Sequence, residues 1–176
     1  EEVFEKGTTD FRSILAKLKK SKPDGLYILG YDNNLGVLPK QIREAGIKAV
    51  ILSIGTIGQP NIIAQAGQSL DGTYFSTTEF SAETPRTDQA KRFAASYDAA
   101  YKSPANYFSS FAYDSISLIT ESIKTNGYSA EAIREGILNI TAYHGVTGMI
   151  SMKTNGDADF PMVVKKIQNG KIEEIQ

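Results

Sequence analysis

The groups in this sequence best suited to binding a ligand are side-chain hydroxyls and accessible backbone amides that follow short apolar runs. Tyr31 follows the run 25–30, and Gly55 and Thr56 follow the run 49–52. A phenol, a small hydroxyl and exposed amides can hold a small organic molecule by stacking and hydrogen bonding. They supply no nucleophile beside a general base. We therefore predict ligand-binding residues at Tyr31, Gly55 and Thr56, and no catalytic residue. An alternative interpretation is that Tyr31 is a surface aromatic covering a sheet edge.

The remaining reactive residue types are scarce. The chain has no cysteine, so thiol catalysis and cysteine-ligated metals are excluded. It has one histidine, His144, which is too few for a histidine-based metal site or a catalytic triad with further histidines. The glycine-rich stretch 55–58 follows an apolar run, but it lacks the complete dinucleotide and Walker patterns. We read it as a turn that leads into the next helix. No metal and no cofactor is predicted.

Composition limits the class of protein. The 176 residues include 19 Lys and Arg against 20 Asp and Glu, for a net charge of −1. A nucleic-acid binder held by bulk charge needs a basic excess, so no nucleic-acid partner is predicted. With 41% apolar and 22% charged residues, the chain is neither a disordered tail nor a membrane protein. Its length fits one domain or slightly more.

The first third of the chain repeats a helix followed by a short apolar strand. Phe11, Leu15 and Leu18 define one helical face, because they recur at helical spacing. The expected strands are 25–30, 49–52 and 72–76, with a helical segment before each. Pro39 is expected in the first turn of the second of these helical segments. This alternation predicts an α/β fold with a doubly wound parallel sheet. Right-handed crossovers make the strands parallel, so their carboxyl ends share one edge. Ligands bind at that edge in open α/β sheets, which brings Tyr31 and Thr56 to one place.

The rest of the chain changes character twice. Residues 77–85 are polar and turn-rich, and the three amphipathic segments that follow have no strand between them. Such helices cannot extend a parallel sheet, so they must pack on something else. The end of the chain is β, with turn signals at Asn155-Gly156 and Asn169-Gly170 that predict a C-terminal hairpin. The expected helices are 90–101, 108–123 and 129–137, and the expected strands are 147–152 and 162–168.

Several stretches, in order, resemble one family. They are residues 7–11, 30–31, 40–46, 70–75, 93–97, 112–114, 143–148 and 155–157. Together they resemble type I periplasmic binding proteins, specifically the leucine/isoleucine/valine-binding substrate-binding components of ABC transporters. The resemblance implies a two-lobed receptor that closes on a small solute. Family members are about twice as long, and this chain resembles only their C-terminal half.

The resemblance also implies a division of the chain. Residues 1–78 and 148–176 would form part of the C-terminal ligand-binding lobe. Residues 79–147 would cross the hinge and supply helices of the N-terminal lobe. The implied partners are a small-molecule solute, the membrane permease of an ABC transporter and the missing N-terminal half of the receptor. The unpartnered helices also predict self-association of the chain alone. The implied location is periplasmic or extracytoplasmic, with the signal peptide outside this chain.

The resemblance carries only part of the site. Tyr31 falls where the amino-acid-binding members place a tyrosine against the ligand. Those members also hold the ligand ammonium with an acidic residue after the next strand, whereas residues 53–56 contain no carboxylate. We therefore expect a small organic solute (amino acid, amide or carboxylate), with neutral or anionic solutes preferred over zwitterionic amino acids. The alternative is a flavodoxin-like α/β enzyme or a ligand-sensing regulatory domain.

Overall fold

The structure, a computed structural model, describes residues 1–31 and 33–175. Two compact units divide the chain, with the first at Glu1–Thr77 and Val164–Gln176 and the second at Thr78–Val163. The first unit therefore contains the repeated helix–strand part of the sequence together with the C-terminal hairpin. The second unit contains the three consecutive helices.

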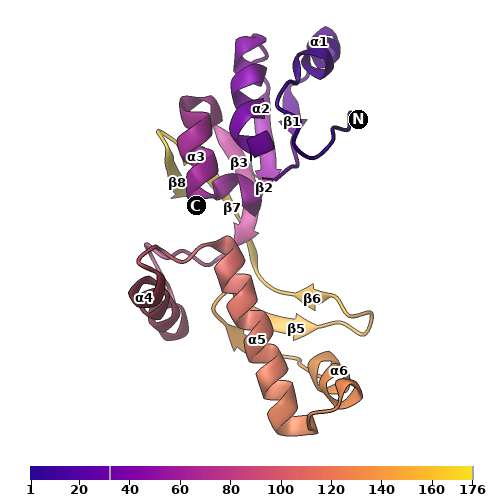
Figure 1. The fold of residues 1–176 in the computed structure, drawn as a ribbon, viewed down its shortest axis with the longest axis vertical. Helices are drawn as coiled ribbons and strands as arrows, with labels where there is room; N and C mark the ends of the chain where they lie inside the picture. Colours follow the sequence, from indigo (N-terminus) through magenta and orange to yellow (C-terminus); the bar gives the residue numbers. More distant parts are fainter. Residues whose placement is uncertain (32, 176) are drawn as a thin grey trace. The chain divides into compact units, whose positions relative to one another are not determined.

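A five-stranded sheet forms the centre of the first unit (Figure 1). The strand order is β1 (Gly25–Tyr27), β2 (Val50–Ile54), β3 (Thr73–Thr78), β7 (Met162–Gln168) and β8 (Lys171–Glu174). Strands β1, β2 and β3 pair in parallel, and β7 pairs with β8 in an antiparallel hairpin. Asn169 and Gly170 both have positive φ, 50° and 71°, as the tight hairpin turn requires. The predicted α/β fold with a parallel sheet and a C-terminal hairpin is confirmed.

The helices of the first unit gather on one side of this sheet (Figure 1). They are α1 (Arg12–Ser21), α2 (Asn33–Glu44) and α3 (Pro60–Ala66), with short 3₁₀ turns η1 (Gly55–Gly58) and η2 (Gly67–Leu70). Large apolar side chains from the helices and strands are fully buried in the core between them. They include Leu15, Leu35, Ile42, Ile51, Ile57, Leu70 and Ile167. Each such side chain contributes roughly 1.5–3 kcal/mol of transfer free energy when it is buried.

Helix α2 begins earlier than the sequence pattern predicts. We expected Pro39 in its first turn, but the helix starts at Asn33 and holds Pro39 in its interior. The buried stripe begins at Leu35, one turn before Leu38, so packing against the core extends the helix toward its amino end. The Asn34 side chain supports this start by donating a 2.6 Å hydrogen bond to the carbonyl of Thr8.

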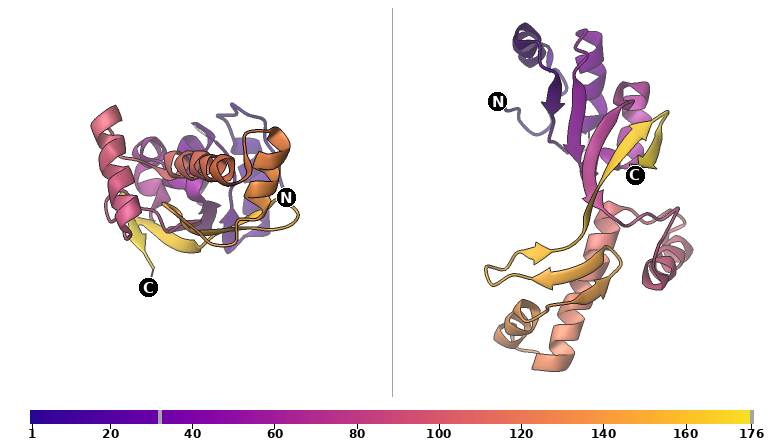
Figure 2. Two further views of the ribbon diagram at one scale, coloured as in Figure 1. Left: turned by 90° about the horizontal axis from the view of Figure 1, so that it is seen from below. Right: turned by 180° about the vertical axis from the view of Figure 1, so that it is seen from behind.

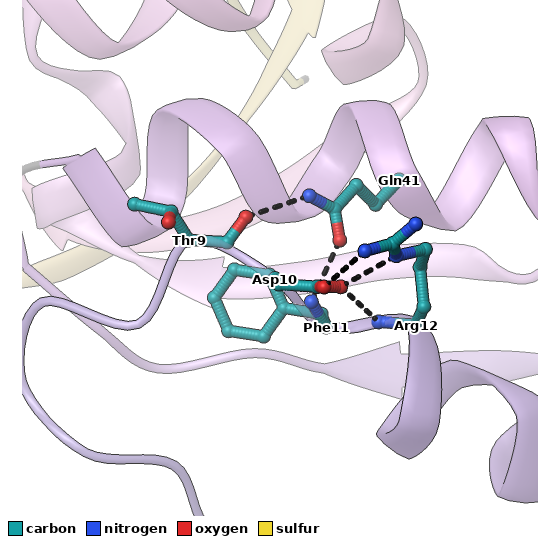
Figure 3. A network of polar contacts seen from close by, with 5 residues as sticks. All are labelled: Thr9, Asp10, Phe11, Arg12 and Gln41. Carbon is teal, nitrogen blue, oxygen red and sulfur yellow. Dashed lines mark hydrogen bonds and ion pairs between the residues drawn. The ribbon is translucent and has the colours of Figure 1, made fainter.

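Gln41 of α2 ties the segment before α1 to the core (Figure 3). Its Oε1 accepts from the Phe11 amide at 2.7 Å, and its Nε2 donates to the Thr9 carbonyl at 2.7 Å. Beside them, the Arg12 side chain donates to the Asp10 carboxylate and lowers the pKa of that exposed group to about 2. The Gln41 side chain thus forms hydrogen bonds with two backbone groups of a segment that is neither helix nor strand.

Replacing Gln41 with alanine is expected to loosen that segment. Both backbone groups lose their partner, and the cost should be about 1–2 kcal/mol because Phe11 lies buried at this point. Hydrogen exchange at the Phe11 amide measures the effect, with Glu44→Ala as an exposed control in the same helix. Equal exchange in Gln41→Ala and in the unaltered protein would contradict this role.

The second unit combines helices with a small antiparallel sheet. Its elements are α4 (Asp88–Tyr101), α5 (Tyr107–Asn126), α6 (Ala130–Leu138), β4 (Tyr143–Gly145), β5 (Gly148–Met152) and β6 (Ala158–Asp159). Each helix has a side-chain N-cap: Thr87 accepts from Ala90 at 3.1 Å, Asn106 and Ser109 form a capping box, and Ser129 accepts from Ala132 at 3.2 Å. Within the described residues, no helix is both long and apolar enough to span a bilayer.

The strands of the second unit explain where the chain changes units. Strands β4, β5 and β6 pair with one another, so residues 148–163 group with α4–α6 and the change occurs at Val164. The resemblance suggested a change near residue 148. Whether the two units correspond to parts of two receptor lobes stays a prediction.

Candidate ligand-binding site

The carboxyl ends of the three parallel strands meet at one edge of the first unit. Tyr27 pairs in register with Leu52, and Leu52 pairs with Tyr74, so the loops that follow these strands leave the sheet at the same edge. Tyr31 belongs to the first of these loops, and Gly55 and Thr56 belong to the second. All three candidate residues therefore lie in one unit, beyond the same edge of one sheet. Asp32, which follows Tyr31 in the sequence, lies outside the described residues.

Tyr31 combines a fixed backbone with an exposed ring. Its carbonyl accepts a 3.2 Å hydrogen bond from the Asn34 amide in the first turn of α2, which anchors the loop. Its side chain is 64% exposed. A tyrosine held at its backbone and open at its ring can stack on a solute and donate a hydrogen bond to it.

Thr56 offers a buried hydroxyl with unused hydrogen-bonding capacity. Gly55 and Thr56 open the 3₁₀ turn η1, where Thr56 is 4% exposed and its Oγ1 lacks a hydrogen-bond partner among the described residues. Buried polar groups are rarely left without a hydrogen-bond partner. The unpaired Thr56 hydroxyl is therefore a candidate to bind a polar group of a ligand. The Thr73 Oγ1 atom, inside β3, is also buried without a hydrogen-bond partner among the described residues, so this property is shared by two threonines.

The neighbouring hydroxyl of Ser53 has a structural role instead. It donates a 2.8 Å hydrogen bond to the Ile28 carbonyl and is buried, which ties the loop after β1 to β2. The stretch 53–56 thus contributes one internally bonded hydroxyl, one unbonded hydroxyl and no carboxylate. This donor and acceptor set suits neutral or anionic polar groups better than an ammonium.

The one histidine of the chain lies in the second unit, away from these candidate residues. His144 occupies β4 of the second unit, exposed and in register with Met149. Over residues 1–31 and 33–175, no three His, Cys, Asp or Glu side chains gather in a way that could hold a metal ion.

Sequence reasoning missed a buried carboxylate in the second unit. Asp114 of α5 is 2% exposed and accepts from the Val146 amide at 2.8 Å, the Thr147 amide at 2.9 Å and the Thr147 hydroxyl at 2.6 Å. It fixes the corner between β4 and β5 to the helix. An acidic residue inside an apolar helical segment was the only available signal, because its partners lie 32 and 33 residues away.

Solved structures share this fold along nearly the whole chain. A leucine-binding protein, LivK, from Thermotoga maritima matches 98% of this chain and 49% of its own, with a TM-score of 0.87 and 26% identity. The branched-chain amino acid transporter substrate-binding protein LivJ from Streptococcus pneumoniae, solved with isoleucine, matches 98% of this chain and 50% of its own, with a TM-score of 0.81 and 26% identity. This chain therefore shares the α/β fold of these two solute-binding proteins.

Sequence relationships identify the family. Residues 1–171 match the family model described as periplasmic binding protein. The leucine-, isoleucine-, valine-, threonine- and alanine-binding protein of Pseudomonas aeruginosa is 26% identical over 152 residues, which are 86% of this chain and 40% of that protein. The Leu/Ile/Val-binding protein homolog 3 of Brucella melitensis is 25% identical over 169 residues, 94% of this chain and 45% of that protein. The chain belongs to the periplasmic binding protein family, and it spans less than half the length of these two relatives.

Proposed function

We propose that the full-length protein is the extracytoplasmic solute-binding component of an ABC-type transporter. It binds a small organic solute in a cleft between two lobes and delivers it to a membrane permease. The observation that carries this proposal is the family match over residues 1–171, whose family consists of solute-binding proteins that act outside the cytoplasm. In this proposal Tyr31, Gly55 and Thr56 contact the solute from the C-terminal lobe, and no residue has a catalytic role.

The remaining half of the receptor is the proposed partner of the second unit. Phe108, Ile116 and Ile119 recur at helical spacing on α5 and are 50%, 64% and 36% exposed. Exposed apolar stripes of this kind mark contact surfaces. In the proposed receptor this stripe packs on the N-terminal lobe, and in the chain alone it promotes self-association.

The solute class follows from the charges at the site. The relatives named above bind branched-chain or small amino acids according to their names. Residues 53–56 of this chain lack a carboxylate that could pair with an amino group. Burying an unpaired ammonium is costly, so the proposed site prefers neutral amides or carboxylates over zwitterionic amino acids. Calorimetric titration of the full-length protein with leucine, small amides and small carboxylates tests this order of affinities. Tight binding of leucine would contradict it.

Replacing Tyr31 with alanine in the full-length protein is expected to weaken solute binding about tenfold or more. The variant loses a stacking face and a hydrogen bond, each worth on the order of 1 kcal/mol. Folding should hardly change, because the ring is exposed. Calorimetry measures the affinity, and Tyr128→Ala serves as the control because Tyr128 is 82% exposed in the second unit. An affinity equal to that of the unaltered protein would remove Tyr31 from the site.

A further inference from the structure

A groove of about 420 Å³ lies between the end of α1 and the loop that joins α2 to β2. It adjoins the amino ends of β1 and β2, because residues 23–24 and 46–49 directly precede these two strands. Figure 2 (right) shows both strands pointing the same way, away from the segments that lead into them. Tyr31, Gly55 and Thr56 follow the carboxyl ends of the strands, so the groove is separate from the candidate solute site.

The groove carries an excess of positive charge. Lys19, Lys22 and Lys48 line it together with Asp24, and three lysines against one aspartate give a net charge of +2. All four residues are exposed, and none of them forms an ion pair with another residue that the structure describes. The whole chain has a net charge of −1, so this excess is local. A bound anion is the natural complement of such a site.

The lysines are not needed to satisfy the helix ends beside them. Cationic side chains near a helix C-terminus often donate hydrogen bonds to its last carbonyls. At the end of α1, the carbonyl of Lys19 already accepts from the Lys22 amide at 3.2 Å. At the end of α2, the carbonyl of Arg43 accepts from the Gly46 amide at 2.9 Å. The ammonium groups that line the groove are therefore available to a ligand.

The two walls of the groove are held in place by the protein itself. The Arg43 guanidinium fixes the loop between α2 and β2, because its Nη1 donates to the Ile47 carbonyl at 3.2 Å and to the Ala49 carbonyl at 2.8 Å. A Cβ built on Gly46 would lie 3.7 Å from Lys19 Nζ, so an ammonium of α1 lies against the backbone of the same loop. The positive charges thus converge before any ligand binds, which lowers the cost of binding.

We propose that this groove binds the phosphate group of a small organic phosphate monoester, either as a free molecule or as the head group of a lipid. Lysine binds phosphate as a point charge, whereas planar carboxylates are typically recognised by an arginine fork, and Arg43 is bonded to backbone carbonyls instead. A phosphate monoester carries about −1.5 to −2 charges at neutral pH, which matches the charge of the groove. The apolar side chains of Pro23 and Ile47 offer a surface to the organic part of the ligand.

Nuclear magnetic resonance titration of the full-length protein with glycerol 3-phosphate tests the proposal. The amide signals of Gly46 and Lys48 should shift with glycerol 3-phosphate and stay unchanged with glycerol, which lacks the charge. Lys19→Ala and Lys48→Ala should each weaken the affinity about fivefold, because each removes one charge-assisted contact at an exposed site. Lys40→Ala is the matched control, because it removes the same charge from an exposed position of α2 outside the groove, and it should change the affinity less than about twofold.

Vesicles distinguish the two sources of the phosphate. Sedimentation of the protein with phosphatidylcholine vesicles that contain phosphatidic acid, lost in the double variant Lys19→Ala/Lys48→Ala, would support a lipid head group. Shifts at Gly46 with glycerol 3-phosphate, without sedimentation, would support a free ligand. Absence of both effects, or an unchanged affinity in the double variant, would overturn the proposal. A shift of the Thr56 amide without one at Gly46 would also overturn it, because the phosphate would then occupy the candidate solute site and leave the proposed function intact.

Discussion

Replacing Asp114 with alanine is expected to destabilise the unit Thr78–Val163 by about 3 kcal/mol or more. The variant leaves the Val146 amide and both donors of Thr147 without the carboxylate that accepts from them. All three residues are buried, and each unsatisfied buried donor costs about 1–3 kcal/mol. The helix and the corner between β4 and β5 should separate as a consequence.

Hydrogen exchange at Val146 and Thr147 gives the most local measurement of this effect. Their amides should exchange much faster in Asp114→Ala, while those of the five-stranded sheet should change little. Glu121→Ala is the control on the same helix, because Glu121 forms an exposed ion pair with Lys124 and should contribute less than about 1 kcal/mol. Protection of Val146 and Thr147 that survives in Asp114→Ala would show that the carboxylate does not hold the corner.

Replacing Gly136 with leucine is expected to separate α5 from α6, at a cost of about 3 kcal/mol. A Cβ at Gly136 would lie 2.1 Å from Ser122 Oγ and 2.9 Å from Ser122 Cβ. The Ser122 hydroxyl cannot simply turn away, because it donates a 2.8 Å hydrogen bond to the Ile133 carbonyl. Overpacking and the loss of that bond therefore act together.

Denaturant unfolding followed by circular dichroism measures the loss in Gly136→Leu. Glu135→Leu introduces the same side chain at the neighbouring exposed position of α6 and should change stability by about 0.5 kcal/mol or less. Gly136→Ala should fall between the two, although alanine is the better helix former. If Gly136→Ala proves more stable than the unaltered protein, the close contact between α5 and α6 is wrong.

Much of the fold could be predicted from the sequence because its signals are local. Apolar runs bounded by glycine or proline marked β2 and β3 within two residues, and the expected strand 162–168 coincides with β7. The predicted start of α2 was wrong. Pro39 suggested that the first turn lies at this residue, whereas the helix starts at Asn33 and its buried stripe begins at Leu35. Strands β4 and β6 have three and two residues, too few to show a periodic pattern.

The shared position of the three candidate residues could be predicted from the sequence, whereas their role in ligand binding stays a prediction. The rule that ligands bind beyond the carboxyl ends of parallel strands placed Tyr31, Gly55 and Thr56 together, and the structure has them at one edge. It could not foresee that the Ser53 hydroxyl bonds within the sheet while that of Thr56 does not, because this depends on side-chain geometry. The Asp114 link was beyond local patterns, since its partners are distant in sequence.

Native mass spectrometry of the full-length protein with a panel of neutral and anionic small solutes tests most directly whether it is a solute-binding component. We expect one solute class to bind with one molecule per protein, and the solute to be released with its mass unchanged after prolonged incubation. Conversion of a bound solute above the background rate would contradict the assignment as a solute-binding component. Failure of every solute in the panel to bind, while leucine binds tightly, would contradict the ligand class inferred from residues 53–56.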